Sequence, residues 1–382
     1  MPPAILIKGE CRAVESTFIW PLRFWFVGVS AAVLVAQVGQ IGPANADIGF
    51  QPPDPSLMSL VIAVSGLAAF AWLNRRGTQR PSDYFRFLHA VGVVFPLIIL
   101  HDAADPTMPA MWLFAGLLIL ALPLLMMASV GAWVSPMKSP GLGDGSIIRF
   151  VVASLLMIVA LAAVLQAPSS AGLSLDDSYT RRLEGRSVYP AGSLLAYGLV
   201  MSMNGFAPYL AFVGSVGKRG LLLFVAMVSS AFFYWLVGVK APALYVVVAA
   251  LLGWAVRNGR ADKIPVYLLQ GIAILGVSVL VEWALFDGYS LVADYLLRRV
   301  YSAPAFIQTR YLHFLMDDKP LVWSWLLGGA SPDFSVTYFI GEYYFGNVNS
   351  NVNTDAFLYA LSASGLLGYL TAVLAVILIL AL

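Results

Sequence analysis

The chain has 382 residues, of which 60% are hydrophobic and only 11% are charged. Soluble domains contain roughly a quarter charged residues, so this composition excludes an ordinary soluble domain. The net charge of +2 gives no sign of a nucleic-acid partner, and one cysteine, Cys11, excludes a disulfide framework. With three histidines and no HExxH motif, neither a metal nor a cofactor is predicted.

Apolar runs recur along the whole chain. A spanning helix needs about 20 largely apolar residues, and stretches such as LFAGLLILALPLLMMASVGAWV and LLLFVAMVSSAFFYWLVG satisfy this need. The sequence therefore predicts an all-α, polytopic membrane protein with about ten transmembrane helices, forming a single integral membrane domain over residues 1–382. The predicted spans are 24–42, 57–74, 87–104, 109–131, 150–167, 191–216, 220–238, 241–256, 264–285 and 356–382.

Lysine and arginine indicate the orientation, because cytoplasmic loops collect them. With the N-terminus inside, the first two outward loops, GPANADIGFQPPDPS and HDAADPTMP, contain neither residue. The cluster Arg75, Arg76, Arg80 and Arg86 then faces the cytoplasm. The first apolar run has no convincing cleavage site, so we expect a retained helix and a cytoplasmic N-terminus.

Two outward loops, 167–190 and 286–355, break this charge rule. Their cationic residues are Arg181, Arg182 and Arg186 in the first loop and Arg298, Arg299, Arg310 and Lys319 in the second. In the second, LVADYLLRRVY and AFIQTRYLHFLMDD predict short helices, and three-residue spacing places Arg310 and His313 on one helical face. We expect the two loops to form a large, helical extracytoplasmic cap.

The arginines predict an anionic ligand. A guanidinium matches phosphate oxygens with paired hydrogen bonds, which suits a lipid-linked phosphate or pyrophosphate whose tail stays in the bilayer. Pairing with acids of the cap, such as Glu184 or Asp294, is the alternative, although surface ion pairs add little stability. A transporter would place charge in mid-membrane, whereas Glu282, His89 and His101 are predicted near span ends.

Three stretches of the second half have a recognisable order. RLEGRSVYPAGSLLAYGLVMSMNGFAPYLAFVGSVGKR begins at Arg182, RRVYSAPAFIQTRYLHF begins at Arg298, and IGEYYFGNVNSNVNTDAFLYALSASGLLG begins at Ile340. They resemble the R-L-E-x-R outer loop, the R-R-x-x-x-x-P-x-x-x-x-x-x-Y-x-x-F segment and the Asn-rich start of a late helix in the oligosaccharide repeat-unit polymerases of bacterial surface polysaccharides, the Wzy or O-antigen polymerase family. The first half is similar only in hydropathy.

The resemblance implies a glycosyltransferase of the bacterial inner membrane without a cofactor. Its partners would be undecaprenyl-pyrophosphate-linked oligosaccharides, membrane lipid, a chain-length regulator and a flippase. A hydroxyl of one unit would attack the anomeric carbon of the chain on another, and lipid pyrophosphate would leave. We expect Arg182 and Arg186 to bind one pyrophosphate, and Arg298, Arg299 and Arg310 to bind the other, where they stabilise the leaving group's charge.

A base must accept the proton of the attacking hydroxyl. The candidates are Glu342, Asp355, Glu184 and His313. The resembled family often has an acid where Tyr359 stands, and Asp355 lies four residues earlier on the same helical face. Sugar binding is expected from Tyr311 and from the amides of Asn347, Asn349, Asn351 and Asn353, for which turn formation is the alternative.

Other functions stay open from the sequence. An O-antigen ligase tends to have a His-Asn pair in the late loop, where this chain has NVNSNVNTD. A flippase or other transporter is the second alternative, and a non-catalytic scaffold would leave the arginine clusters without a role. The chain ends in AVILILAL without a polar tail. Either a final helix ends flush with the membrane, or a further C-terminal span follows, as the resemblance implies.

Overall fold

The computed structural model describes most of the chain, and the described part is helical with connecting turns. The described residues are 30, 33–46, 49–50, 57, 61–62, 64–66, 68, 81–133, 146–174, 177–190, 193–317, 335–346, 348 and 352–381. Among the predicted site residues, Asn351 lies outside them, as do Asn347 and Asn349.

Within this described part, seven helices are long and apolar enough to cross a membrane. They are Ser82–Ala104, Ala110–Met127, Ser146–Val164, Leu194–Val216, Gly220–Val237, Ile264–Leu285 and Ala356–Ile379. Two shorter apolar helices, Val33–Ala44 and Ala241–Arg257, overlap further predicted spans. The prediction of an all-helical, polytopic membrane protein is confirmed, while the count of ten spans stays a prediction.

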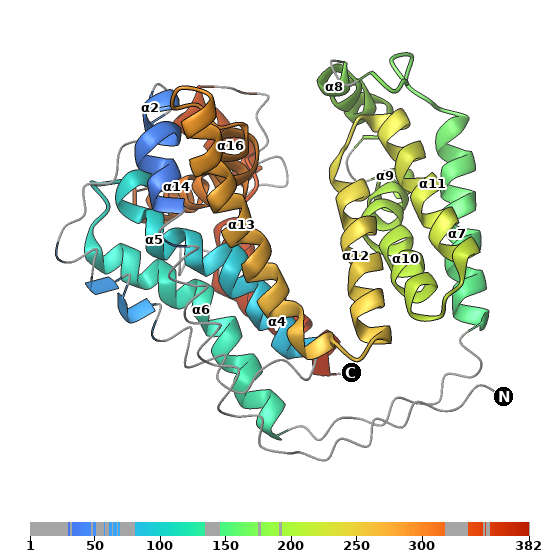
Figure 1. Ribbon diagram of the computed structural model, residues 1–382, viewed down its shortest axis with the longest axis horizontal. Coiled ribbons are helices and arrows are strands. Elements are labelled where there is room, and N and C mark those ends of the chain that lie inside the picture. The colour runs from blue at the N-terminus through green and yellow to red at the C-terminus, as the bar shows by residue number, and fades with distance from the viewer. Residues whose placement is uncertain are drawn as a thin grey trace. The chain divides into compact units, whose positions relative to one another are not determined.

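The chain divides into two compact units, and its assignment to one domain stays a prediction. Unit 1 comprises Met1–Met137 and Pro265–Leu382, and unit 2 comprises Lys138–Ile264 (Figure 1). The helices of unit 1 are η1 (Gln37–Ile41), α2 (Gly42–Ala44), α4 (Pro81–His89), η3 (Ala90–Val94), α5 (Phe95–Ala104), α6 (Ala110–Trp133), α13 (Ile264–Leu285), η6 (Ala293–Ser302), α14 (Ala303–Asp317), α16 (Val336–Phe345) and α17 (Ala356–Ala381).

The arginine-rich segment of unit 1 is part of its core. η6 and α14 follow each other without a break, where two short helices were predicted. The π-helical turns of η6 end just before Pro304, which has no N–H to donate. α14 packs on α5 and on α6, where Leu312 fills the space beside Gly116, and Gln308 donates to the carbonyl of Val93 in η3 at 3.0 Å. The predicted loop 286–355 therefore contains a helix that is packed into the unit.

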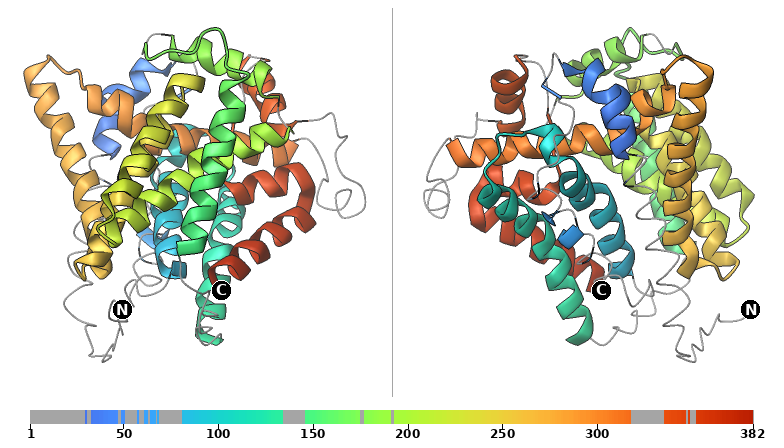
Figure 2. Two further views of the ribbon diagram at one scale, coloured as in Figure 1. Left: turned by 90° about the vertical axis from the view of Figure 1, so that its right-hand side faces the viewer. Right: turned by 60° about the vertical axis from the view of Figure 1, so that its left-hand side comes forward.

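The helix α17 changes direction at Gly365, and Figure 2 shows its two arms. Gly365 has φ 64° and ψ −162°, a conformation open essentially to glycine. The rings of Phe357 and Tyr369 lie 6.5 Å apart, whereas their twelve-residue separation would correspond to roughly 18 Å along a straight helix. The Tyr369 hydroxyl donates to the carbonyl of Ile119 at 2.7 Å, which fixes the second arm to α6. The predicted span 356–382 is therefore bent.

Unit 2 contains the other predicted arginine loop. Its helices are α7 (Ser146–Val164), α8 (Ser178–Val188), α9 (Leu194–Met201), η4 (Ser202–Phe206), α10 (Ala207–Val216), α11 (Gly220–Val237), α12 (Ala241–Arg257) and η5 (Ala261–Lys263). Gly253 lets α12 approach α10, because a Cβ there would lie 2.5 Å from the carbonyl of Phe212. The polar helix α8, from the predicted loop 167–190, lies against the end of α11, where Gly238 meets Ser178.

Candidate functional site

A buried carboxylate marks the end of α5. Asp105 directly follows the last helical residue, its backbone is extended, and its residue surface is 5% exposed. One carboxylate oxygen, Oδ1, accepts hydrogen bonds from the backbone N–H of Thr107 at 3.0 Å and from its hydroxyl at 2.7 Å. This turn fixes the carboxylate, and its second oxygen faces α14.

Two side chains of α14 meet that second oxygen. His313 donates from Nε2 to Asp105 Oδ2, and Nη1 of Arg310 lies 3.4 Å from the same atom. The shared helical face of Arg310 and His313 is as predicted from their spacing. A carboxylate that accepts a hydrogen bond from an imidazole fixes the orientation of the ring. A fixed ring position is what proton transfer from a bound hydroxyl requires.

Aromatic rings hold the Arg310 guanidinium from the other sides. Its central carbon lies 4.5 Å from the ring centre of Phe306 and 5.9 Å from that of Tyr344, distances typical of cation–π contacts. Phe306 is itself stacked on Phe50, with ring centres 4.5 Å apart. A guanidinium has five N–H donors, and the contact with Asp105 uses one of them. The side chain is thus both positioned and able to bind an anion.

Arg298 is held about three helical turns before Arg310. Its Nη1 donates to Oδ1 of Asn45 at 2.9 Å, and its Nε lies 3.0 Å from a carboxylate oxygen of Asp294. Asn45 is fixed in turn by a hydrogen bond from its amide to the carbonyl of Ile41 at 2.8 Å. Segments that the sequence places in three outward loops, 42–56, 101–109 and 286–355, therefore meet at one end of unit 1 (Figure 1).

The predicted ion-pair alternative holds in part. Asp294 was among the expected acidic partners and does pair with Arg298, at the surface of the unit. The partner of Arg310 is Asp105, which no sequence pattern had singled out. Arg299 is exposed, and the described residues offer it no hydrogen bond or ion pair. The three arginines assigned to one pyrophosphate thus have three different surroundings.

In unit 2, Arg181 of α8 is buried, whereas Arg182 and Arg186 lie nearer the surface. Arg181 is fully buried, donates from Nη2 to the carbonyl of Ser174 and lies 5.3 Å from the ring centre of Tyr234. Arg182 is half-buried, with Nε 3.4 Å from the carbonyl of Gly238, and Arg186 is exposed. Arg182 and Arg186 are four residues apart and share a helical face, as joint binding of one anion requires.

Glu184 is fixed by the turn that precedes α8. Its carboxylate accepts hydrogen bonds from Ser170 and from both the N–H and the hydroxyl of Ser169, at 2.7–3.0 Å. The hydrogen bonds from Ser170 and Ser169 lower the pKa of Glu184 to about 2. A carboxylate with so low a pKa is a weak base, which argues against the proton-accepting role considered for it.

Two further candidate bases lie in unit 1. Asp355 caps α17, since its Oδ1 accepts hydrogen bonds from the backbone N–H groups of Phe357 at 2.9 Å and Leu358 at 3.0 Å. Burial raises the pKa of Asp355 above its ordinary value. Glu342 is exposed on α16, and its carboxylate has no hydrogen-bond partner among the described residues. Neither lies in the arrangement that Asp105 creates for His313.

The candidate sugar-binding residues differ in access. Tyr311 is fully buried, and its hydroxyl donates to the carbonyl of Val352 at 2.8 Å. This hydrogen bond joins α14 to the segment that precedes α17. Because the Tyr311 ring is buried, it has no surface for a sugar to contact. Asn353, in contrast, is exposed, two residues before the α17 cap.

His89 lies inside the span Ser82–Ala104, because α4 begins at Pro81, earlier than the predicted start at residue 87. The expectation that His89 lies near a span end is thus wrong. Its Nε2 lies 3.1 Å from the carbonyl of Leu120, and its ring packs between Phe85 and Phe357, at 5.8 and 5.2 Å between ring centres. These contacts join α4 to α6 and α17, which is a structural role.

The sequence analysis missed Asp105 and Asn45. The available signals were modest: both stand in the two outward loops without lysine or arginine, and an Asp-Pro pair such as Asp105-Pro106 favours a turn. Only the folded structure shows that these loops supply the partners of Arg310 and Arg298.

Fold and site together define a polytopic helical membrane protein with an arginine, histidine and carboxylate cluster at one end of a helical unit. Comparisons of the chain with models of protein families, with curated proteins and with solved structures found no match.

Proposed function

We propose that the protein polymerises undecaprenyl-pyrophosphate-linked oligosaccharide repeat units into a surface polysaccharide, such as an O-antigen, a capsule or an exopolysaccharide. One observation supports this most directly: Arg310 and His313 share the buried carboxylate of Asp105 at one end of unit 1. Polymerisation needs a group that binds phosphate beside a group that accepts a proton, and these side chains have both properties.

In the proposed reaction, a sugar hydroxyl of one lipid-linked unit attacks the anomeric carbon of the chain on another. The new C–O bond forms as the bond between the anomeric carbon and the phosphate oxygen breaks, and the electron pair stays on the pyrophosphate. Arg298, Arg299 and Arg310 bind this pyrophosphate through N–H donors, in the bound substrate and as its charge grows. His313, oriented by Asp105, takes the hydroxyl proton.

This assignment selects His313 over the other candidate bases. Glu184 has the low pKa of a carboxylate that accepts several hydrogen bonds, and Asp355 uses one oxygen to cap α17. Glu342 is exposed and stays a second candidate. Arg182 and Arg186 of unit 2 bind the second lipid pyrophosphate in the proposal, and exposed Asn353, with Asn351, contributes to sugar binding.

The proposal includes a location and partners. We infer a multi-pass protein with about ten spans, located in the bacterial inner membrane as the family resemblance implies. Its N-terminus is cytoplasmic, which follows from the distribution of lysine and arginine. The arginine cluster then faces outward, where the lipid-linked units, delivered by a flippase, are polymerised and a chain-length regulator acts.

Deletion of the gene, followed by gel analysis of surface polysaccharide, tests the function. A polymerase mutant makes a product with a single repeat unit, and plasmid-borne wild-type gene restores the ladder. Arg298→Ala, Arg299→Ala and Arg182→Ala should fail to restore it at equal membrane expression. Arg257→Ala should restore it, because Arg257 lies on a predicted cytoplasmic segment and, among the residues that the structure describes, donates to the carbonyl of Ser215 alone.

The same experiment separates the alternatives. Long polymer that accumulates on the undecaprenyl carrier indicates an O-antigen ligase, and the absence of outer-leaflet intermediates indicates a flippase. A normal ladder in the deletion strain, or in all three outer-arginine variants, contradicts the proposal.

A further inference from the structure

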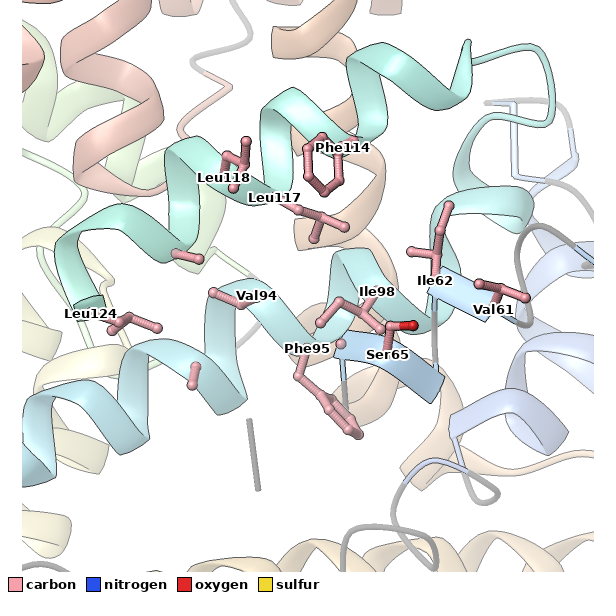
Figure 3. Close-up of a pocket in the computed structure, with 13 residues that line it drawn as sticks. Val61, Ile62, Ser65, Val94, Phe95, Ile98, Phe114, Leu117, Leu118 and Leu124 are labelled. Atoms are coloured by element: carbon pink, nitrogen blue, oxygen red, sulfur yellow. The ribbon is translucent and has the colours of Figure 1, made fainter. Parts of the chain in front are cut away.

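An apolar pocket of about 400 Å³ lies in unit 1 between η3, α5, α6 and the segment that contains Val61 and Ser65. Figure 3 shows side chains from all of these elements around it, including Phe95 and Ile98 below and Leu117 above. Its volume is that of a small ligand-binding pocket. The hydroxyl of Ser65 is the only polar side-chain group among the residues that line it.

The pocket is accessible from the surface of the unit. Two of its lining residues on α6, Phe114 and Leu118, are 60% and 49% exposed, so its wall continues onto the outer face of that helix. α6 contains the membrane-spanning segment Ala110–Met127. A surface of this helix without polar groups is therefore open to hydrocarbon, and a hydrocarbon chain can enter from the side.

The pocket also lies close to the charged cluster. α5 contributes Ile98 to the pocket wall and ends directly before Asp105, which binds Arg310 and His313. Asp105 lies seven positions after Ile98, which is roughly 10 Å along the helix. Other wall residues, Val94 and Ala90, lie further along the same helical run, away from the cluster. The charged cluster and the apolar wall of the pocket therefore follow one another along a single helical run.

We infer that this pocket binds the first isoprene units of the polyprenyl tail whose pyrophosphate is bound by the Arg310 cluster. This inference rests on the proposed function, because it takes the lipid substrate from there. A phosphate head at the cluster and a single apolar chain leading away from it match the order of the two surfaces along α5. The volume is suited to one chain, whereas a phospholipid presents two.

Ala121 offers a way to close the pocket. It lies on the α6 wall and is only partly buried, so a larger side chain there would occupy the pocket. Leu122, the next residue, is 39% exposed, does not line the pocket and points about 100° away around the helix. Ala121→Phe and Leu122→Phe therefore form a matched pair, and Leu118→Trp at the pocket's mouth provides a second closing variant.

The test is photo-crosslinking of the purified full chain in detergent with a polyprenyl pyrophosphate that has a diazirine in its second isoprene unit. We expect labelled peptides from α5 and α6. Ala121→Phe and Leu118→Trp should lower the labelling at least tenfold, and Leu122→Phe should stay within twofold of wild type. Size-exclusion profiles identify a closing variant that fails to fold, in which case the other closing variant decides.

Three results would overturn the inference. They are labelling of other helices, labelling that both folded closing variants leave unchanged, and equal competition by phosphatidylglycerol vesicles, which would assign the pocket to bulk lipid. Because the assay requires no turnover, it is independent of polymerisation. Labelling of the pocket by a protein that makes no polymer contradicts the proposed function alone, and polymerisation without pocket labelling contradicts this inference alone.

Discussion

Asp105 and His313, separated by 208 positions in the sequence, are in hydrogen-bond contact at the end of unit 1. Asp105 is held by Thr107 and by the end of α5, and His313 is held by α14, which packs on α5. Because both partners belong to packed helices or their termini, the contact has a defined geometry. Such positioning is what a proton-accepting histidine requires.

Arg298 should contribute to substrate binding. Arg298→Ala removes charge-assisted hydrogen bonds that are each worth about 1.5–3 kcal/mol, so the KM for the lipid-linked substrate should rise about tenfold to a hundredfold. Arg298→Lys keeps the charge but loses the planar fork, and we expect an intermediate KM. Steady-state assays in liposomes measure these values.

Asn45 should act through Arg298. Asn45→Ala removes the acceptor at 2.9 Å from Nη1 but leaves the ion pair with Asp294 intact. We therefore expect a KM rise of only a few fold, and no further rise when the substitution is added to Arg298→Ala. Fully additive effects of the two substitutions would show that Asn45 does not work through this arginine.

Gly365 should be required for the bend in α17. Gly365→Ala places a Cβ at φ 64° and ψ −162°, which should cost about 1–3 kcal/mol of unfolding free energy. Gly271→Ala is the matched control, because Gly271 lies within helix α13 and a Cβ there meets nothing within 4 Å. Denaturant titration in mixed micelles should show the first variant destabilised and the control unchanged or slightly stabilised. Equal stabilities would contradict the bend.

The pH dependence of stability should reveal the Glu184 turn. The pKa of Glu184 is about 2 in the folded protein against an ordinary 4.5, so ionisation stabilises the fold. The stabilisation is complete above about pH 4.5 and is lost as the pH falls toward 2. The difference in Tm between wild type and Glu184→Gln should therefore be largest at neutral pH and shrink below pH 4.5. A difference independent of pH would contradict this role.

Local sequence patterns predicted the helices and the shared face of Arg310 and His313. Apolar runs and three-residue spacing depend on neighbours in the chain, so both can be recognised without a structure. The contacts that define the site are different. Asp105 and Asn45 reach their partners over 205 and 253 positions, and no local period encodes such pairs.

Burial was the second property that the sequence could not supply. Tyr311 and Arg310 are adjacent, yet the tyrosine is fully buried against Val352 while the arginine keeps part of its surface. The bend at Gly365 was hidden because the sequence around it, LSASGLLG, contains no proline and no charged residue, and glycine alone does not indicate a turn.

The most direct test of the account is the turnover of His313→Ala and Asp105→Asn with undecaprenyl-pyrophosphate oligosaccharide in liposomes, followed by gel analysis of chain length. A general base and the residue that orients it should affect kcat, which should fall about 10²–10⁴-fold in His313→Ala while KM changes by a few fold. Asp105→Asn should lower kcat as well. Polymerisation by His313→Ala at the wild-type rate would contradict the account.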